Sequence, residues 1–377
     1  MAAVNLIQSL SPETFYDTII YHLAVPNFWK IEGKIKDMPY LIFSKMPFNH
    51  GLVYLYCLET GSVACAKIVN WFISIFTLFS FFAFFRGRFS DRTLFGAAAV
   101  FFSIFHYMNV SWYASNDAML TFFILCSFYL SLRYAENLSH RTAALAGLMA
   151  GFAMGIKYTS AIFVFGIFVS IFYSMRGRLS SFFKFLLFFA IFACMPVLPW
   201  LVKNFLLYGN PFYPMLYNVF QKDISPLDAS LINSFMKEVK QFDFNFKDWL
   251  MHPLNVSVGK IANDEYFTPV FALLLPMAFF NRKENILVKT MMIYFLSSWL
   301  LWSFSSNVVR YLMPAWFAGS ILVSYYTFEA FEGIFARALK YALLFTVALS
   351  FYWSLLFFYM EGKWRVFFGI IKADDYL

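Results

Sequence analysis

The sequence predicts an all-α polytopic membrane protein, and three observations support this fold class. The chain of 377 residues is 61% hydrophobic and only 13% charged, about half the charged fraction typical of soluble proteins. Its charges cluster between apolar runs of 16 to 25 residues, the length a helix needs to cross a bilayer. The net charge of +8 does not indicate nucleic-acid binding, because the positive residues fall mostly between these runs, where they set orientation.

We expect about ten transmembrane helices in two groups. Residues 1–60 are interpreted as an amphipathic loop on the outer face, followed by six helices in 61–202. A polar outer segment, 203–265, precedes four further helices in 266–360, and 361–377 form an outer tail.

The run 141–174 is too long for one transmembrane helix and is interrupted only by Lys157. We therefore predict two short helices that meet at Lys157. The other predicted spans are 61–85, 93–112, 117–132, one ending near 201, 266–281, 287–304, 311–328 and 338–360.

The distribution of basic residues predicts the orientation of the chain. With ten crossings, the short loops on one side hold only Lys157 and Arg310, whereas those on the other side hold thirteen basic residues. The positive-inside rule makes the richer side cytoplasmic. The thirteen are Arg86, Arg88, Arg92, Arg133, Arg141, Arg176, Arg178, Lys184, Arg282, Lys283, Lys289, Arg337 and Lys340.

The stretch 15–33, which precedes the first predicted span, contains an acid and a histidine among apolar residues. If it is helical, Asp17 and Tyr21 share one face and His22 lies beside them. A short amphipathic helix of this kind would lie on the membrane surface and point its polar edge at the membrane domain. We predict that Asp17 is the centre of an active site, although an isolated acid near an interface is more often simply solvated.

Three other charged residues have ordinary structural explanations. In Ser115-Asn116-Asp117, the amide can cap the following helix and Asp117 can complement its dipole. Lys157 can extend from the join between two short helices, and Lys203 can complement the negative end of a span. Each also lies on the predicted outer side.

Arg310 is harder to explain by structure alone. It lies on the side that the positive-inside rule disfavours, at the start of a helix, where the dipole repels a cation. A charge kept against both preferences indicates an anionic partner, and a phosphate matches the planar fork of guanidinium donors.

These residues predict a few carboxylates and cations around an outward-facing cavity. A carboxylate can deprotonate an attacking hydroxyl or hold a divalent cation, and cations at the interface can hold the phosphate of a lipid carrier. Motifs for nucleotide hydrolysis, zinc proteolysis and the common serine hydrolases do not occur in the sequence.

Several motifs, in this order and spacing, resemble the bacterial polytopic glycosyltransferases of the GT-C superfamily. Their relatives include the protein mannosyltransferases and the lipid A aminoarabinose transferase. The resemblance covers almost the whole chain. The matching motifs are Asp17…Tyr21-His22…Pro26…Gly33-Lys34-Ile35, Pro47-Phe48-Asn49, Tyr113-Ala114-Ser115-Asn116-Asp117, a GxxxGxxxGxK pattern ending at Lys157, Pro199-Trp200-Leu201-Val202-Lys203-Asn204, Tyr208-Gly209-Asn210-Pro211-Phe212-Tyr213-Pro214 and Arg310-Tyr311-Leu312-Met313-Pro314.

The resemblance implies an enzyme of the inner (cytoplasmic) membrane whose active face points outward. In such enzymes an Asp of the first outer loop is the catalytic base or a metal ligand, and the donor is a polyprenyl-phosphate-linked sugar. That role would fall on Asp17, with Asp117 as a second catalytic acid. Tyr21, His22, Lys157, Lys203 and Arg310 would bind substrate. A divalent cation is a possible cofactor, and no nucleic-acid partner is expected.

A carrier or flippase for lipid-linked saccharides, or for another anionic lipid, is the alternative prediction. It would use the same cations and cavity without chemistry. A scaffolding membrane subunit is a third possibility. A transporter needs polar residues deep in its spans, and only His106 and Asn109 stand out there. The ionisable residues gather on one side, which favours the enzyme.

The same resemblance implies that the sequence is truncated at both ends. Relatives have a span before the catalytic loop, whereas sixteen residues precede Asp17 here. The tail also ends where relatives continue into further outer sequence. We expect that a fragment of this kind can lack activity.

Overall fold

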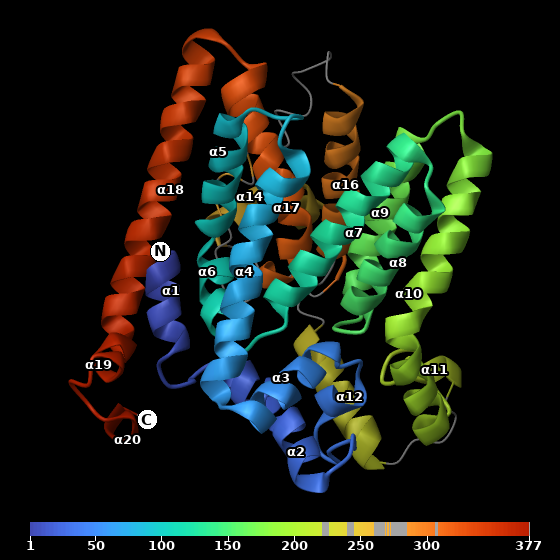
Figure 1. The fold of residues 1–377 in the computed structure, drawn as a ribbon, viewed down its shortest axis with the longest axis vertical. Coiled ribbons are helices and arrows are strands. Elements are labelled where there is room, and N and C mark those ends of the chain that lie inside the picture. The colour runs from blue at the N-terminus through green and yellow to red at the C-terminus, as the bar shows by residue number, and fades with distance from the viewer. Residues whose placement is uncertain are drawn as a thin grey trace.

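The computed structural model describes residues 1–220, 226–239, 245–259, 285–305 and 308–376, together with positions 268, 270 and 272. Within these residues the regular structure is helical, and the only strand-like pairing is an isolated bridge between Arg86 and Phe89. The helices form an upright bundle with a group of short helices at one end (Figure 1). The predicted all-α polytopic membrane fold is confirmed.

Five helices in the described part of the chain are long and apolar enough to cross a membrane. A sixth span results if α5 (Asp91–Phe102) and α6 (Phe105–Trp112), which meet at 74°, are counted together. The total of about ten stays a prediction, since 266–281 lies outside the described residues apart from three positions. The five long helices are α4 (Val63–Phe85), α7 (Asp117–Asn137), α10 (Leu179–Tyr208), α16 (Ile286–Ser303) and α18 (Gly333–Glu361).

The run 141–174 folds as two helices, as predicted. α8 (His140–Met154) and α9 (Ser160–Ser174) are separated by a short break that contains Lys157. α8 packs closely on α10 through its small residues: a Cβ on Gly147 or Gly151 would lie 2.1 Å from the Phe189 carbonyl oxygen or 2.2 Å from that of Ala193. Such close approach of backbones stabilises helix pairs in membranes, where burial from water contributes little.

α17 (Met313–Tyr325) completes the centre of the bundle. Its residues Met313 to Ser324 are all buried. A π-helical turn, η5 (Tyr326–Ala330), leads from it to α18. α18 stands at one side of the bundle (Figure 1) and buries only 11% of its most apolar window, as expected for a helix that faces lipid.

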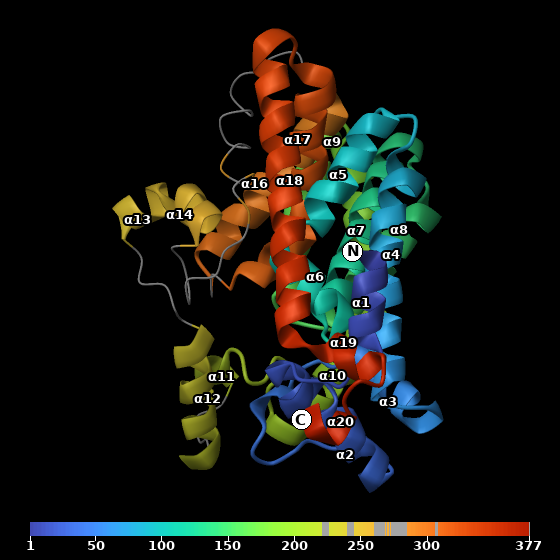
Figure 2. The same ribbon diagram turned by 90° about the vertical axis from the view of Figure 1, so that its left-hand side faces the viewer.

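Residues 1–60 are not the separate outer loop that the sequence predicts. Their first helix, α1 (Ala2–Ser9), lies along α4 and α6 within the bundle (Figures 1 and 2). The Asn5 side chain is fully buried and donates to the Met108 carbonyl at 3.3 Å and to the Ser111 hydroxyl at 2.6 Å. Buried amides with partners explain why this half-polar helix packs inside instead of on the membrane surface.

The short helices gather at the lower end of the bundle in Figure 1, which we call the site end. The connections α4–α5, α9–α10 and α17–α18 lie at the opposite end. The elements of the site end are η1 (Thr18–His22), α2 (Ala24–Glu32), η2 (Ile42–Lys45), α3 (Asn49–Thr60), α11 (Tyr217–Phe220), α12 (Pro226–Val239), α19 (Lys363–Phe367) and α20 (Ala373–Tyr376).

The predicted polar segment 203–265 is not one cap. Its first residues belong to α10, which continues to Tyr208. α13 (Phe246–Leu250) and α14 (His252–Val258) project beside α16 (Figure 2), and the Trp249 indole donates to the Ser303 hydroxyl at 3.0 Å. Apolar side chains in this part of the segment explain its contact with a membrane-crossing helix.

We expect the site end to face away from the cytoplasm, because the connections rich in Arg and Lys lie at the opposite end. Two single-cysteine variants, Lys34→Cys and Ser90→Cys, place a thiol at each end. In sealed cells a membrane-impermeant maleimide should label the cysteine at 34 and reach that at 90 only after permeabilisation. Labelling of both from the same side would contradict this orientation.

Candidate functional site

Four charged side chains from distant parts of the chain converge at the site end. Arg310 contacts both Asp17, at 2.5 Å, and Asp117, through its Nε atom at 3.5 Å. Asp117 also pairs with Lys157 at 3.4 Å. The sequence predicts that Asp17, Asp117 and Arg310 meet within about one substrate length, and the structure brings them into direct contact. We call these four residues the acid–base cluster.

Asp17 is held in place by the segment that precedes it. It stands immediately before η1. The carboxylate of Glu13 accepts from the backbone N–H of Ala114 at 3.2 Å, and the hydroxyl of Thr18 donates to the carbonyl of the same residue at 3.3 Å. The Phe15 ring stacks on Tyr113 at 4.7 Å. These contacts fasten the segment around Asp17 to the residues just before Asp117.

A buried lysine, Lys67, also holds the segment that precedes Asp17. The Lys67 ammonium, on α4, is fully buried and donates to the carbonyl of Ser11 at 2.6 Å and to that of Pro12 at 3.3 Å. A buried ammonium needs such partners. Six residues before the catalytic candidate, the chain therefore has a fixed anchor on a membrane-crossing helix.

Asp117 lies in the first turn of α7, and its side chain is only 5% exposed. The sequence suggests a capping role for Asn116, but the structure shows no side-chain cap at this residue. The Asp117 carboxylate faces Arg310 and Lys157 instead.

Arg310 belongs to a short 3₁₀ helix, η4 (Val309–Leu312), that leads into α17. Its guanidinium lies 5.6 Å from the Phe15 ring centre and 5.5 Å from that of Tyr311. Two carboxylates and two rings therefore surround this cation. Their presence explains how a positive charge is accommodated at the start of this helical segment, where the helix dipole disfavours one.

Lys157 is positioned by the break between α8 and α9. The backbone N–H of Asn49 donates to the Gly155 carbonyl at 2.8 Å, and a Cβ on Gly155 would lie 1.9 Å from the Asn49 side chain. Any larger residue at this position would therefore displace the Asn49 side chain. The ammonium of Lys157 lies 3.3 Å from the centre of the Tyr311 ring, so it faces the cluster and does not extend along the membrane surface.

The acid–base cluster balances two negative with two positive charges in a partly buried position. The side chains of Asp17, Arg310 and Lys157 are 17%, 20% and 18% exposed. Paired charges in such a setting interact more strongly than on an open surface, because water screens them less. An incoming phosphate would compete with the carboxylates for Arg310 and Lys157.

The cluster does not fit a divalent cation. Within the described ranges no three His, Cys, Asp or Glu side chains come close enough to hold a metal ion. Asp17 and Asp117 are both bound to Arg310, a cation that already occupies the place between them. A divalent ion normally takes several oxygen ligands, and we derive no chemical step through a metal.

Tyr21 and His22 lie beside the cluster in different environments. Tyr21 lines a cavity of about 100 Å³ together with Lys157 and Tyr311. Burial, followed by the nearby Asp17 carboxylate, raises the pKa of Tyr21 well above its usual value, so its hydroxyl keeps its proton and can donate. The His22 ring does not line this cavity. Its Nδ1 atom lies 3.0 Å from Nε2 of His50, and His50 does line the cavity.

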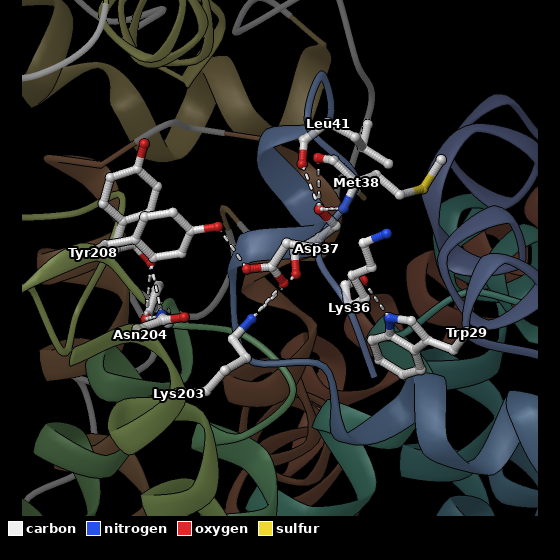
Figure 3. Close-up of polar contacts among 11 residues, drawn as sticks. Trp29, Lys36, Asp37, Met38, Leu41, Lys203, Asn204 and Tyr208 are labelled. Carbon is white, nitrogen blue, oxygen red and sulfur yellow. Dashed lines mark hydrogen bonds and ion pairs between the residues drawn. The ribbon is translucent and has the colours of Figure 1, made fainter. Parts of the chain in front are cut away.

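Lys203 belongs to a second polar cluster, which Figure 3 shows. Its ammonium pairs with one oxygen of Asp37 at 2.7 Å, and the hydroxyl of Tyr208 donates to the other oxygen at 2.6 Å. The helix does not end before Lys203, because α10 continues to Tyr208. Its contacts join α10 to the loop after α2 and hold that loop against the bundle.

Three residues that the structure makes important carry no functional prediction from the sequence. Asp37 is the partner of Lys203, Lys67 anchors the segment around Asp17, and His50 joins His22 to the cavity. His50 follows directly after the Pro47-Phe48-Asn49 motif, which is the one signal that could have drawn attention to it. Lys67 lies in an apolar run, where a single lysine gives no sign of its partner.

Comparisons with known proteins bear on the fold. The crystal structure of ArnT from Cupriavidus metallidurans bound to undecaprenyl phosphate is similar to this chain, with a TM-score of 0.60 and 14% sequence identity. The similarity covers 87% of this chain and 59% of that chain, so this protein spans well under two thirds of ArnT. At this identity the likeness shows a shared fold alone. No curated protein matches the sequence.

The sequence also matches one protein-family model, described as "Domain of unknown function (DUF8201)", over residues 1–317. This match includes all four residues of the acid–base cluster and extends through most of the helical bundle. The chain therefore belongs to the DUF8201 family.

Proposed function

We propose that the protein is a membrane glycosyltransferase that moves a sugar from a polyprenyl-phosphate donor to an acceptor hydroxyl on the outer face of the inner membrane. The observation that carries this proposal is the acid–base cluster: two carboxylates joined by one guanidinium, at one end of a membrane bundle. The GT-C-like fold supports it, because ArnT was crystallised with undecaprenyl phosphate.

Arg310 and Lys157 bind the donor phosphate in this proposal. A guanidinium fork can bind two phosphate oxygens, and as it does so Arg310 loosens its contact with Asp17. The carboxylate of Asp17 is then free to accept a proton. Asp117 keeps its contact with Lys157 and holds this cation beside the phosphate.

The transfer itself needs one base and one stabilised leaving group. Asp17 takes the proton of the acceptor hydroxyl as its oxygen bonds to the anomeric carbon of the sugar. The bond between this carbon and the phosphate oxygen breaks, and the electron pair leaves with polyprenyl phosphate. Arg310 and Lys157 stabilise the charge that develops on that phosphate. Lys203 has no part in this scheme, because it belongs to the second polar cluster with Asp37 and Tyr208.

The proposal can be tested with purified protein in bilayer discs. The discs are given polyprenyl phosphates that carry radiolabelled glucose, galactose, mannose or aminoarabinose, together with an extract of envelope lipids and glycans as acceptor. We expect at least one donor to release free polyprenyl phosphate and to transfer its label. If protein that still unfolds cooperatively on heating consumes none of these donors, the proposal fails for this class of donor.

A further inference from the structure

A cavity of about 100 Å³ opens beside the acid–base cluster. Lys157 and Tyr311 form the wall nearest to the cluster, and aromatic side chains form much of the remainder. The volume is large enough for several water molecules, each of which needs about 10–15 Å³, or for a small polar ring. The aromatic residues of the wall are Tyr21, Phe43, Phe48, Tyr158, Phe235 and Tyr311.

Two buried polar atoms in residues of this wall have no hydrogen-bond partner. They are Nδ1 of His50 and the hydroxyl oxygen of Thr159. His50 itself is only 1% exposed. Buried polar atoms nearly always have partners, and an exception calls for an explanation. Both residues line the cavity, although neither of these atoms has accessible surface in this structure. A ligand with its own donor and acceptor groups would supply both partners once these side chains turn toward it.

The contact with His22 fixes what His50 can offer such a ligand. Only one proton can lie between Nδ1 of His22 and Nε2 of His50, which are 3.0 Å apart. When His22 donates, the other nitrogen of a neutral His50 carries a proton; when His50 donates, that nitrogen is an acceptor. Burial, and then the charge of Lys157, lower the pKa of His50 to about 3, so the ring is neutral at ordinary pH.

The wall is therefore chemically suited to a neutral, hydroxylated ring. Lys157 is the one cation among the described residues of the wall, and Asp117 already balances its charge. A hydroxyl can donate and accept, and so can match either form of the His22–His50 pair. Aromatic side chains suit the apolar face of a sugar ring.

We propose that this cavity binds the transferred sugar of the donor, and that His50, oriented by His22, forms a hydrogen bond to one of the hydroxyls of that sugar. This inference rests on the proposed function and adds a residue that discriminates among sugars. Lys157 belongs both to the cluster and to the cavity wall, so a donor phosphate held by Lys157 and Arg310 would lie at the edge of this cavity. A sugar without the matching hydroxyl leaves His50 unpaired and binds less well.

The inference is tested by binding, so that its outcome does not depend on turnover. Thermal unfolding in detergent is followed with bare polyprenyl phosphate and with polyprenyl phosphate carrying glucose, galactose or mannose. A ligand that binds the folded state raises the unfolding temperature. We expect at least one sugar-bearing lipid to bind more tightly than the bare phosphate lipid, and we call this difference the sugar increment.

His50→Phe keeps a flat ring and removes the hydrogen bond. We expect this variant to bind the sugar-bearing lipid about 10- to 100-fold more weakly than the wild type does. Its affinity for bare polyprenyl phosphate should stay within twofold of the wild-type value. His140→Phe is the matched control: this exposed histidine begins α8 and stacks on Phe188 at 4.5 Å. Thr159→Val, a smaller change at the same wall, replaces His50→Phe as the test if that variant does not fold.

Two results would overturn the inference. In one, no sugar adds affinity beyond that of bare polyprenyl phosphate. In the other, the variants of the cavity wall keep the full sugar increment, as His140→Phe does. Donor consumption with either result would retain the proposed function and reject this subsite. A clear sugar increment without any turnover would reject the proposed function and keep the subsite.

Discussion

Asp17→Asn should reduce the rate of sugar transfer by ~10²–10⁴-fold, the usual contribution of a general base. The amide keeps the size and shape of the carboxylate but cannot take the proton of the acceptor hydroxyl. Donor binding should be nearly unchanged, because Asn leaves Arg310 free to meet the phosphate. Initial rates and donor affinities, measured on the same preparation in bilayer discs, separate these two effects.

Asp37→Asn is the matched control for this change. Asp37 is also a buried carboxylate paired with a lysine, and its side chain is 8% exposed. It contacts Lys203 and Tyr208, neither of which belongs to the acid–base cluster. We expect this variant to unfold at a lower temperature and to keep its turnover number. A loss of turnover as large as that of Asp17→Asn would mean that any buried carboxylate at the site end has this effect.

Arg310→Leu should have the second-largest effect, and it should act on both binding and stability. Removal of the guanidinium leaves two carboxylates side by side without their shared cation. Breaking a buried ion pair in this way costs roughly 3–5 kcal/mol, and we expect about 3 because the cluster is partly open to water. Separately from this loss of stability, loss of the contact to phosphate should weaken donor binding by ~1.5–3 kcal/mol.

Arg310→Lys distinguishes charge from geometry at the same position. Lysine keeps the positive charge but cannot contact both carboxylates through a planar fork. We expect it to recover most of the thermal stability and only part of the donor affinity. Thermal unfolding and titration with polyprenyl phosphate measure the two quantities. Full donor affinity in Arg310→Leu would show that the phosphate binds elsewhere.

The fold class and the position of the acid–base cluster could be predicted from sequence for a simple reason. In a chain this apolar there are few charged residues, and those that are partly buried at the same end of the bundle are expected to pair with one another. Arg310 violates two placement rules, so it had to have anionic neighbours. The break at Lys157 followed from length alone, because the largely apolar 34-residue run 141–174 exceeds one bilayer crossing.

Partners of single polar residues could not be predicted in the same way. A lysine near a helix end satisfies the dipole rule whether or not a carboxylate is present, so the contact between Lys203 and Asp37 had no signal in the sequence. The packing of α1 into the bundle could not be predicted, because Asn5 and Gln8 find their partners on elements more than a hundred residues away. The contact between His22 and His50 likewise depends on how α3 packs against η1.

The most direct test of the central claim is the fate of the donor in sealed vesicles that contain only the wild-type protein, a labelled donor and an acceptor. A transferase breaks the bond between sugar and phosphate, whereas a carrier moves the intact lipid across the bilayer. Mass spectrometry of the recovered lipids distinguishes the two. We predict one free polyprenyl phosphate for each sugar transferred. Intact donor, recovered in the opposite leaflet with no free polyprenyl phosphate, would contradict the account.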